Sequence, residues 1–200
     1  MRRALDVAAA LVGLAVLAVP MAVIAVAIRL ESPGPALFRQ RRIGREGRPF
    51  TLYKFRTMRQ GAGDGPLREQ IARELAGEDT SSRGSFKIDD DARVTRVGRL
   101  LRATSLDELP QLVNVLTGSM TLVGPRPCLE WEAEMFPPAY HERFRVRPGL
   151  TGLWQVSGRS TLSTLAMLEL DVRYVRSRTL AADLAILART PRALLRGGAR

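Results

Sequence analysis

Two adjacent carboxylates, Asp107 and Glu108, stand where the sequence predicts a helix over residues 106–116. Ser105 and Glu108 have the spacing of a capping box, which would give Glu108 a purely structural role. Asp107 falls in the first turn, where the helix dipole favours the ionised form of a carboxylate. An ionised aspartate is the nucleophile of enzymes that form an aspartyl phosphate. The pair therefore predicts either a helix cap or carboxylate chemistry on a phosphate.

A carboxylate nucleophile needs cations if it is to approach a phosphate. Like charges 4 Å apart repel by roughly 4 kcal/mol per pair at an effective dielectric constant of about 20. Arg102 lies about one helical turn before Asp107, and Arg126 lies in a Gly-Pro-Arg-Pro turn. Arg147 and Arg159 flank a loop that is rich in glycine and proline. We expect these arginines to bind phosphate charge, with a divalent ion supplying the remainder.

The composition narrows the class of protein. The chain has 200 residues, 46% of them hydrophobic, which fits one domain of ordinary size plus a membrane segment. The chain has one cysteine, Cys128, and one histidine, His141. We therefore expect neither an internal disulfide nor a zinc site of the usual Cys/His type. Any metal would have oxygen ligands. The net charge of +11 suits nucleic acid, anionic lipid or a phosphorylated substrate, and charge alone does not choose among them.

Residues 7–28 contain no charged residue. An uncharged run of this length predicts that the chain associates with a membrane. At about 1.5 Å per residue they would form a helix of roughly 33 Å, enough to cross a hydrocarbon core of about 30 Å. A cleaved signal peptide is disfavoured, because its apolar part usually has about 7 to 15 residues and because Asp6 fits poorly in it. A spanning helix is the default for a run of this length, but basic residues on both sides give little asymmetry to orient it.

Pro20, near the middle of the apolar run, favours a second mode of insertion. A proline removes a backbone hydrogen bond and bends a helix. A bent helix would enter and leave the membrane by the same face and keep both charged ends in the cytoplasm. We expect this re-entrant form for residues 1–30, while the spanning form stays open.

Residues 31–200 predict a small, mostly helical domain of the α+β class. Two β-like runs, residues 36–43 and 50–57, are joined by a loop with glycines and a proline and predict a hairpin. Period two places Lys54 and Arg56 on one face of the second run. Helices are predicted at residues 130–135, at 162–175 and, basic and amphipathic, at 180–195.

Residues 60–92 are rich in Gly, Asp and Ser, and we interpret them as a mobile insertion around one short helix at residues 66–76. The run Asp89, Asp90 and Asp91 resembles a metal cluster. We favour a solvated loop whose last aspartate caps a helix that starts near Ala92.

Taken together, these features resemble the bacterial sugar transferases, the monotopic phosphoglycosyl transferases that begin assembly of cell-surface glycans on a polyprenyl phosphate. Larger relatives carry further membrane helices in front, so the chain looks like the minimal catalytic form. The matching segments follow the family's order from residue 1 to about residue 190: residues 32–35, 53–58, 104–109, 124–127, 147–159 and 170–175.

The resemblance implies a UDP-sugar donor, a polyprenyl (undecaprenyl) phosphate acceptor, UMP as a product and Mg²⁺ as cofactor. It implies that Asp107 attacks the sugar-bearing phosphate, forms a covalent phosphosugar intermediate and binds the metal. Glu108 would assist the acceptor phosphate or help to arrange the metal. The residues expected to bind phosphate or nucleotide are then Lys54, Arg56, Arg102, Arg126, Arg147 and Arg159.

The resemblance also implies a re-entrant helix bent at a Ser-Pro pair, interfacial amphipathic helices, and a catalytic domain on the cytoplasmic face of the bacterial inner membrane. In this chain the pair is Val19-Pro20. The proline that would cause the bend is kept, and the serine that would support it by hydrogen bonding is missing.

The main alternative is a membrane-tethered basic protein that binds anionic lipid or nucleic acid. It would explain the charge, but not why Asp-Glu, Gly-Pro-Arg-Pro and Arg-Pro-Gly-Leu-Thr-Gly occur together, so we expect no nucleic-acid partner. A multi-span transferase is disfavoured because no other uncharged run reaches about 20 residues. The sequence identifies neither the sugar, nor the glycan pathway, nor the oligomeric state.

Overall fold

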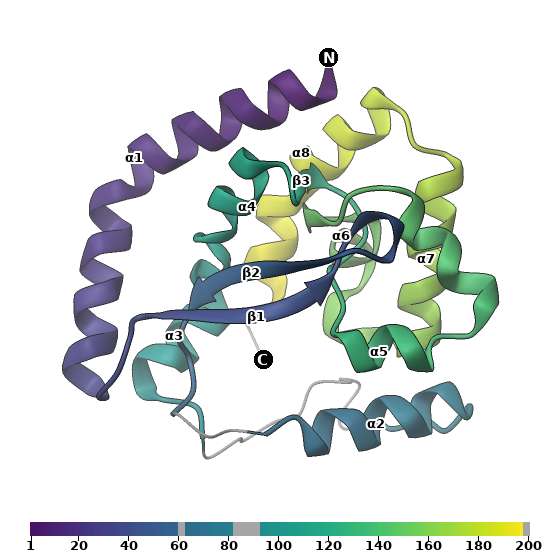
Figure 1. The fold of residues 1–200 in the computed structure, drawn as a ribbon, viewed down its shortest axis with the longest axis horizontal. Helices are drawn as coiled ribbons and strands as arrows, with labels where there is room; N and C mark the ends of the chain where they lie inside the picture. The colour runs from purple at the N-terminus through teal and green to yellow at the C-terminus, as the bar shows by residue number, and fades with distance from the viewer. Residues whose placement is uncertain (60–62, 82–92, 198–200) are drawn as a thin grey trace.

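The computed structural model describes residues 1–59, 63–81 and 93–197. Its first element, α1 (Arg2–Glu31), is the predicted apolar helix, and by length and composition it can cross a membrane. Its apolar side chains are largely exposed; Val16 and Val19 are 70% and 73% exposed. The helix changes direction about halfway along its length (Figure 1) and contains Pro20, which accounts for a bend of this kind.

The predicted hairpin is confirmed. Strand β1 (Leu37–Ile43) pairs antiparallel with β2 (Pro49–Phe55), and the short 3-10 helix η1 (Arg45–Gly47) joins them. Helix α4 (Gln111–Thr117) is fixed on β2 by Asn114. The Asn114 side chain accepts a hydrogen bond from the N–H of Tyr53 at 3.0 Å and donates one to the C=O of Thr51 at 2.7 Å.

Helix α1 packs along α4 rather than standing apart from the domain. Ala10 of α1 is fully buried in a cluster with Leu52, Val115 and Met120. The approach is close: a Cβ added to Gly13 would lie 3.1 Å from the Cδ1 atom of Leu112. One face of α1 therefore belongs to the core of the domain, and its other apolar side chains are exposed.

A second pair of strands was not predicted. Strand β3 (Thr121–Val123) runs parallel to β4 (Gly149–Thr151), and three-residue strands are too short to show a period-two pattern. The backbones approach so closely that a Cβ on Gly149 would lie 2.0 Å from the backbone nitrogen of Gly124. This pair brings the Gly-Pro-Arg-Pro turn beside the loop before helix α6 (Leu153–Ser157).

The predicted helices are found with two corrections, and α6, η3 and η4 were not predicted. The helix predicted over residues 106–116 is divided into a 3-10 turn, η2 (Leu106–Glu108), and α4. The helix predicted to start near Ala92 starts at Arg96, where the Thr95 hydroxyl accepts a hydrogen bond from the N–H of Gly98 at 2.9 Å. The aspartate run at 89–91 lies outside the described residues. The other helices are α2 (Gly65–Leu75), α3 (Arg96–Thr104), α5 (Glu130–Met135), η3 (Pro138–Arg145), η4 (Arg159–Thr161), α7 (Thr164–Arg176) and α8 (Leu180–Gly197).

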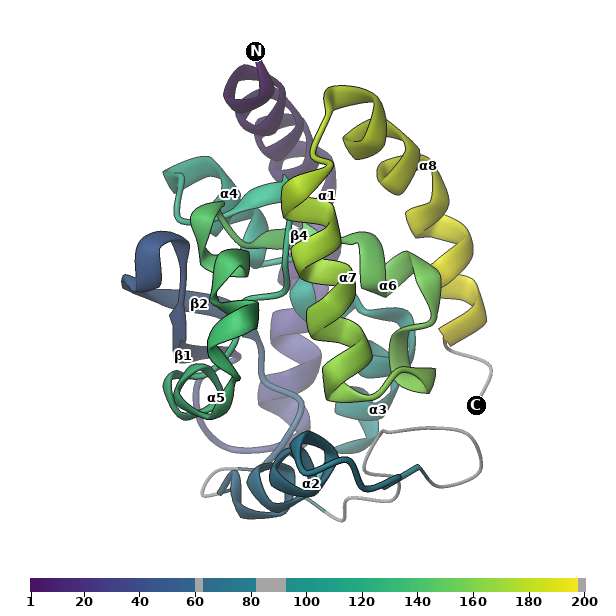
Figure 2. The same ribbon diagram turned by 90° about the vertical axis from the view of Figure 1, so that its right-hand side faces the viewer.

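The last two helices complete the domain. Helix α7 lies across the domain from the second half of α1 (Figure 2), and α8 returns to the N-terminal end of α1. There Arg2 Nε lies 2.9 Å from Asp183 Oδ2, and the Tyr174 hydroxyl donates to Asp183 Oδ1 at 2.6 Å. The predicted α+β class, mostly helical with one short hairpin, is confirmed.

Candidate active site

The turn that carries the two carboxylates is made by a residue in the left-handed region. Helix α3 is followed by Ser105, whose φ is 57°, and η2 begins directly after it. The Ser105 hydroxyl does not cap η2; it accepts a hydrogen bond from Arg159 Nη2 at 2.9 Å. The predicted capping box is therefore wrong, and Glu108 is not used as a helix cap.

Asp107 is buried against a lysine. Its side chain faces Lys54 of β2, with 3.9 Å between Asp107 Oδ2 and Lys54 Nζ. Burial raises the pKa of the Asp107 carboxyl, the neighbouring Glu108 charge raises it further, and Lys54 acts in the opposite direction. Burial lowers the pKa of Lys54. The sequence predicted that the helix dipole would favour the ionised form of Asp107. In the structure burial opposes ionisation, and the nearby cations Lys54, Arg102 and Arg126 are what favour the ionised form.

Glu108 faces Arg126 of the Gly-Pro-Arg-Pro turn, with 3.6 Å between Glu108 Oε1 and Arg126 Nη1. The backbone of this turn is held from behind by Arg143, whose Nη2 donates to the C=O of Arg126 at 2.7 Å. The same guanidinium group pairs with Asp171 Oδ2 at 2.7 Å, and both side chains are almost completely buried. Loss of either partner would leave an uncompensated buried charge, so this pair fixes the position from which Arg126 reaches Glu108.

These side chains border a narrow recess between the hairpin, η2 and the segment that runs from β4 into α6. Asp107 lies at its edge, against Lys54. The recess brings Arg42, Lys54 and Arg126, cations from separate parts of the sequence, to one place beside Glu108, and such cations are the donors that bind a phosphate. Its polar lining residues are Arg42, Lys54, Glu108, Gln111, Arg126 and Gln155.

Arg102 and Arg159 lie next to the turn that holds Asp107. Arg102 Nε donates to the Thr57 hydroxyl at 3.0 Å, and its charge lowers the pKa of Asp107. Arg159 is anchored through Ser105 and through the C=O of Ala193, which accepts from its Nη1 at 3.2 Å. The structure therefore brings three of the six predicted cations, Lys54, Arg102 and Arg126, to the carboxylates, and it bonds a fourth, Arg159, to Ser105 of the turn that carries them.

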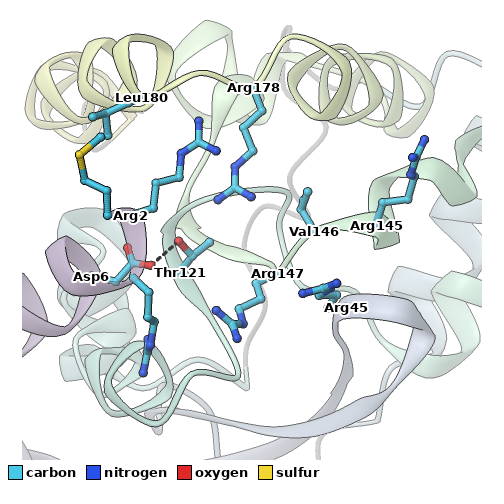
Figure 3. A pocket seen from close by; sticks show the side chains of 11 residues that line it. Arg2, Asp6, Arg45, Thr121, Arg145, Val146, Arg147, Arg178 and Leu180 are labelled. Atoms are coloured by element: carbon cyan, nitrogen blue, oxygen red, sulfur yellow. Dashed lines mark hydrogen bonds between the residues drawn. The ribbon is translucent and has the colours of Figure 1, made fainter.

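The other two predicted cations lie elsewhere. Arg56 is buried, and its Nη atoms donate to the C=O of Pro33 and to the C=O and hydroxyl of Ser32 at 2.7 to 2.8 Å. It ties the segment after α1 to the end of β2. Arg147 lines a separate, larger cavity (Figure 3). The structure does not bring either side chain to Asp107.

Three polar residues of the recess were missed from the sequence: Arg42, Gln111 and Gln155. Phe38 lies opposite Lys54 in the hairpin register, so period two along β1 places Arg42 on the face of Lys54 and would have identified it. Gln155 presents a buried Oε1 atom that has no hydrogen-bond partner in the described part of the chain. No local pattern in the sequence marks Gln111 or Gln155 as lining a site.

The two carboxylates fit a magnesium ion whose other ligands are substrate phosphates and waters. They do not fit a metal that is held by protein side chains alone. Among the residues that the structure describes, no group of three or more His, Cys, Asp or Glu side chains is placed to hold a metal. Mg²⁺ in nucleotide sites usually has one or two carboxylates, with substrate phosphates and waters completing its octahedron. Asp107 and Glu108 supply that number and type of ligand.

Comparison with known proteins gives a consistent picture. The chain is 39% identical over 197 residues to the galactosyl transferase CpsE of Streptococcus agalactiae, covering 98% of this chain and 42% of CpsE. It is 45% identical over 202 residues to a UDP-glucose:undecaprenyl-phosphate glucose-1-phosphate transferase of Caulobacter vibrioides, covering 97% of this chain and 69% of the relative. It is 42% identical over 167 residues to the undecaprenyl-phosphate galactose phosphotransferase of Salmonella typhimurium, covering 82% and 34% respectively.

The chain thus spans less than half the length of CpsE and of the Salmonella relative. The family model described as bacterial sugar transferase matches residues 1–197, from the first turn of α1 to the end of α8. The match includes the η2 turn, the Gly-Pro-Arg-Pro turn and the hairpin that together form the recess. The chain therefore belongs to the bacterial sugar transferase family.

Proposed function

We propose that the protein transfers a sugar 1-phosphate from a UDP-sugar to a polyprenyl phosphate such as undecaprenyl phosphate and releases UMP. The observation that carries this proposal is the charged cluster at the recess: Glu108 faces Arg126 there, and buried Asp107 faces Lys54, which lines the recess. The names of the Caulobacter and Salmonella relatives support the substrate classes. Two relatives named as exopolysaccharide production proteins support a place at the first membrane step of surface glycan assembly.

In the first half-reaction, a carboxylate oxygen of Asp107 attacks the phosphorus atom that carries the sugar. A bond forms between this phosphorus and Asp107, the bond to the bridging oxygen of UMP breaks, and UMP leaves. Each carboxylate–phosphate charge pair at 4 Å costs about 4 kcal/mol at an effective dielectric constant of about 20. Lys54, 3.9 Å from Asp107, and the arginines around the turn offset this repulsion.

In the second half-reaction, an oxygen of the polyprenyl phosphate attacks the same phosphorus atom. The bond to Asp107 breaks, the carboxylate is restored, and the product is a polyprenyl diphosphate sugar. Glu108 orients the acceptor phosphate or a cation bound to it, and Arg126 restrains Glu108 at 3.6 Å. Because both displacements occur at one phosphorus, a single nucleophilic carboxylate is sufficient.

Asp107 is the proposed protein ligand of Mg²⁺, with Glu108 adjacent. When bound, Mg²⁺ neutralises charge on the diphosphate of the donor. The permanent positive charge comes from the chain itself. Lys54 faces Asp107, Arg126 faces Glu108, and Arg159 is bonded to Ser105 of the turn that carries them, with Arg102 close enough to lower the pKa of Asp107.

We propose that α1 is re-entrant, with residues 1–30 as the membrane segment and residues 31–200 as a domain on the cytoplasmic face of the inner membrane. Support comes from the N-terminal end of α1, which the domain holds. The Arg3 guanidinium group donates to the C=O groups of Val115 and Leu116, and Asp6 Oδ2 accepts from the Thr121 hydroxyl at 2.8 Å.

The same domain holds the other end of α1. Glu31 accepts hydrogen bonds from the N–H groups of Arg96 and Val97 at 2.7 and 2.9 Å, so it caps the start of α3, and these bonds lower the pKa of Glu31. A helix that spans a membrane has its ends on opposite sides of a hydrocarbon core of about 30 Å. A domain that binds both ends from one side is compatible with a helix that returns to the side it entered.

This topology predicts the accessibility of a cysteine at the exposed position Ala4. In a Cys128→Ser background, Ala4→Cys should resist a membrane-impermeant maleimide in intact cells and react once the inner membrane is permeabilised. Adding Pro20→Ala should straighten the helix and increase labelling from the periplasm. Ser177→Cys, exposed at the end of α7, serves as the cytoplasmic control. Labelling of Ala4→Cys in intact cells, with Ser177→Cys protected, would establish a spanning helix instead.

The reaction itself is tested by product release. Detergent-solubilised protein with undecaprenyl phosphate and Mg²⁺ should release UMP from at least one member of a UDP-sugar panel that includes UDP-glucose and UDP-galactose. Omission of the lipid phosphate should stop turnover after at most one UMP per chain, because the sugar phosphate has no second acceptor. Continuous UMP release without lipid would identify a hydrolase and contradict the proposal.

A further inference from the structure

A large cavity lies away from the carboxylates, at the N-terminal end of α1. Its volume is about 690 Å³, within the range of about 300 to 1,000 Å³ that is usual for small-ligand sites. The recess beside Asp107 and this cavity share no lining residue. The arginines that line the cavity are Arg2, Arg3, Arg45, Arg145, Arg147 and Arg178.

These guanidinium groups come from elements that are distant in the sequence. Arg2 and Arg3 belong to the first turn of α1, Arg45 to the tip of the hairpin, Arg147 to the loop before β4, and Arg178 to the connection between α7 and α8. In Figure 3 the groups of Arg2, Arg45, Arg147 and Arg178 border one space from different sides. The tertiary structure therefore gathers arginines from distant elements. Three of them have carboxylate partners: Arg2 pairs with Asp183, Arg45 with Glu46 and Arg145 with Glu142.

Part of this charge has no carboxylate partner. Asp6 is the only acidic residue among the lining residues, and its two oxygens already accept from the Thr121 hydroxyl at 2.8 Å and the N–H of Leu122 at 3.0 Å. Within the described part of the chain, Arg147 has no hydrogen-bond or ion-pair partner for its guanidinium group. Arg178 forms no ion pair there; its Nε donates to the Tyr174 hydroxyl at 3.2 Å, and its guanidinium group lies over the Tyr174 ring, 6.0 Å from the ring centroid. Guanidinium groups that face one space without counter-charge favour an anion between them.

The position of the cavity indicates where that anion comes from. Arg2, Arg3 and Asp6 are the last charged residues before the uncharged run 7–28, so the cavity lies where α1 enters the apolar phase. In a bilayer, this level contains the phosphates of the lipid headgroups. Basic pockets beside membrane helices on the cytoplasmic side bind anionic headgroups in this way. Two guanidinium groups match a phosphate because each offers a planar pair of N–H donors.

We infer that this cavity binds the phosphate headgroup of an anionic membrane phospholipid, with Arg147 and Arg178 as its main ligands. The inference rests on the membrane placement of α1 proposed above and not on the transfer reaction. It assigns Arg147 to a lipid phosphate beside the membrane helix rather than to the donor diphosphate at Asp107. A lipid held here anchors the N-terminal end of α1 at the membrane surface.

The test uses the full chain in neutral detergent and native mass spectrometry to count bound lipids. Dioleoyl phosphatidylglycerol should remain bound at a stoichiometry of one, whereas dioleoyl phosphatidylcholine should not. The double variant Arg147→Gln/Arg178→Gln should weaken phosphatidylglycerol binding at least tenfold. The matched control is Arg41→Gln/Arg176→Gln, which removes two exposed, ion-paired arginines outside the cavity and should bind as the parent does.

Three outcomes would overturn the inference. Equal weakening in both double variants would show a diffuse charge effect, and unchanged binding in Arg147→Gln/Arg178→Gln would place the lipid elsewhere. Competition by UMP or inorganic phosphate at concentrations similar to those of the lipid would assign the cavity to a soluble phosphate. The number of bound lipids can be measured without turnover. The inactive variant Asp107→Asn should therefore bind phosphatidylglycerol as the unchanged protein does. A failure of the transferase proposal is therefore distinguishable from a failure of this one.

Discussion

Asp107→Asn should abolish both turnover and the covalent intermediate. The substitution keeps the size of the side chain and removes the carboxylate that attacks phosphorus. Incubation of the unchanged protein with a UDP-sugar and no lipid acceptor should add the mass of one sugar phosphate to the intact chain. The asparagine variant should show no such mass increase and no UMP release above background. Unfolding temperatures measured in parallel should show that the variant is folded, because Asp107 makes only one long ion pair, at 3.9 Å.

Glu108→Gln is the matched control for this experiment. If Glu108 acts on the acceptor phosphate, the adduct should form and should persist when undecaprenyl phosphate is added. If Glu108 instead helps to hold the metal, both half-reactions should slow together. An adduct that forms in Asp107→Asn but not in Glu108→Gln would reassign the nucleophile to Glu108 and would contradict the proposed mechanism.

Arg126→Ala should lower kcat/KM by on the order of 10²-fold or more, similar to loss of one preorganised donor in an oxyanion site. The reason is geometric: Arg126 is presented to Glu108 from a turn whose carbonyl is held by the buried pair of Arg143 and Asp171. Arg126→Lys should recover part of the loss, because it restores the charge without the planar pair of donors. The measurement is steady-state UMP release with varied UDP-sugar.

Arg41→Ala provides the comparison for Arg126. Arg41 is exposed on β1 and pairs with Glu130 at 3.0 Å, outside the recess. It should change kcat/KM by less than about twofold, because exposed ion pairs contribute little. Losses of similar size at both positions would mean that the reaction depends on overall positive charge and not on a built site.

The sequence alone identified the parts of the protein whose physical signal is local. An uncharged run of sufficient length identified α1, and two β-like runs joined by a loop with glycines and a proline identified the hairpin that contains Lys54. Helix α5 was predicted at its observed residues, 130–135. Asp107 and Glu108 were singled out because two adjacent carboxylates stand at a predicted helix start close to an arginine. In each case the residues that carry the signal are neighbours in the chain.

Helix starts were less predictable from the sequence. A capping pattern shows that a side chain can bond to the first turn of a helix, but not whether another residue takes that side chain instead. Ser105 and Glu108 satisfy the pattern of a capping box, but Arg159 takes the Ser105 hydroxyl and Ser105 adopts the left-handed region. The first turn of the predicted helix therefore became the separate 3-10 turn that presents Asp107 to Lys54. A contact from a residue more than fifty positions away decided this local structure.

The tertiary structure alone decided which cations serve the carboxylates. A guanidinium group can equally cap backbone carbonyls, pair with a buried carboxylate or face a ligand, and its sequence context does not distinguish these uses. Arg56 binds the carbonyls after α1, Arg143 holds the turn of Arg126, and Arg147 faces the cavity at the start of α1. The last two assignments depend on the parallel pairing of β3 with β4, which joins segments almost thirty residues apart and leaves no periodic signal in either.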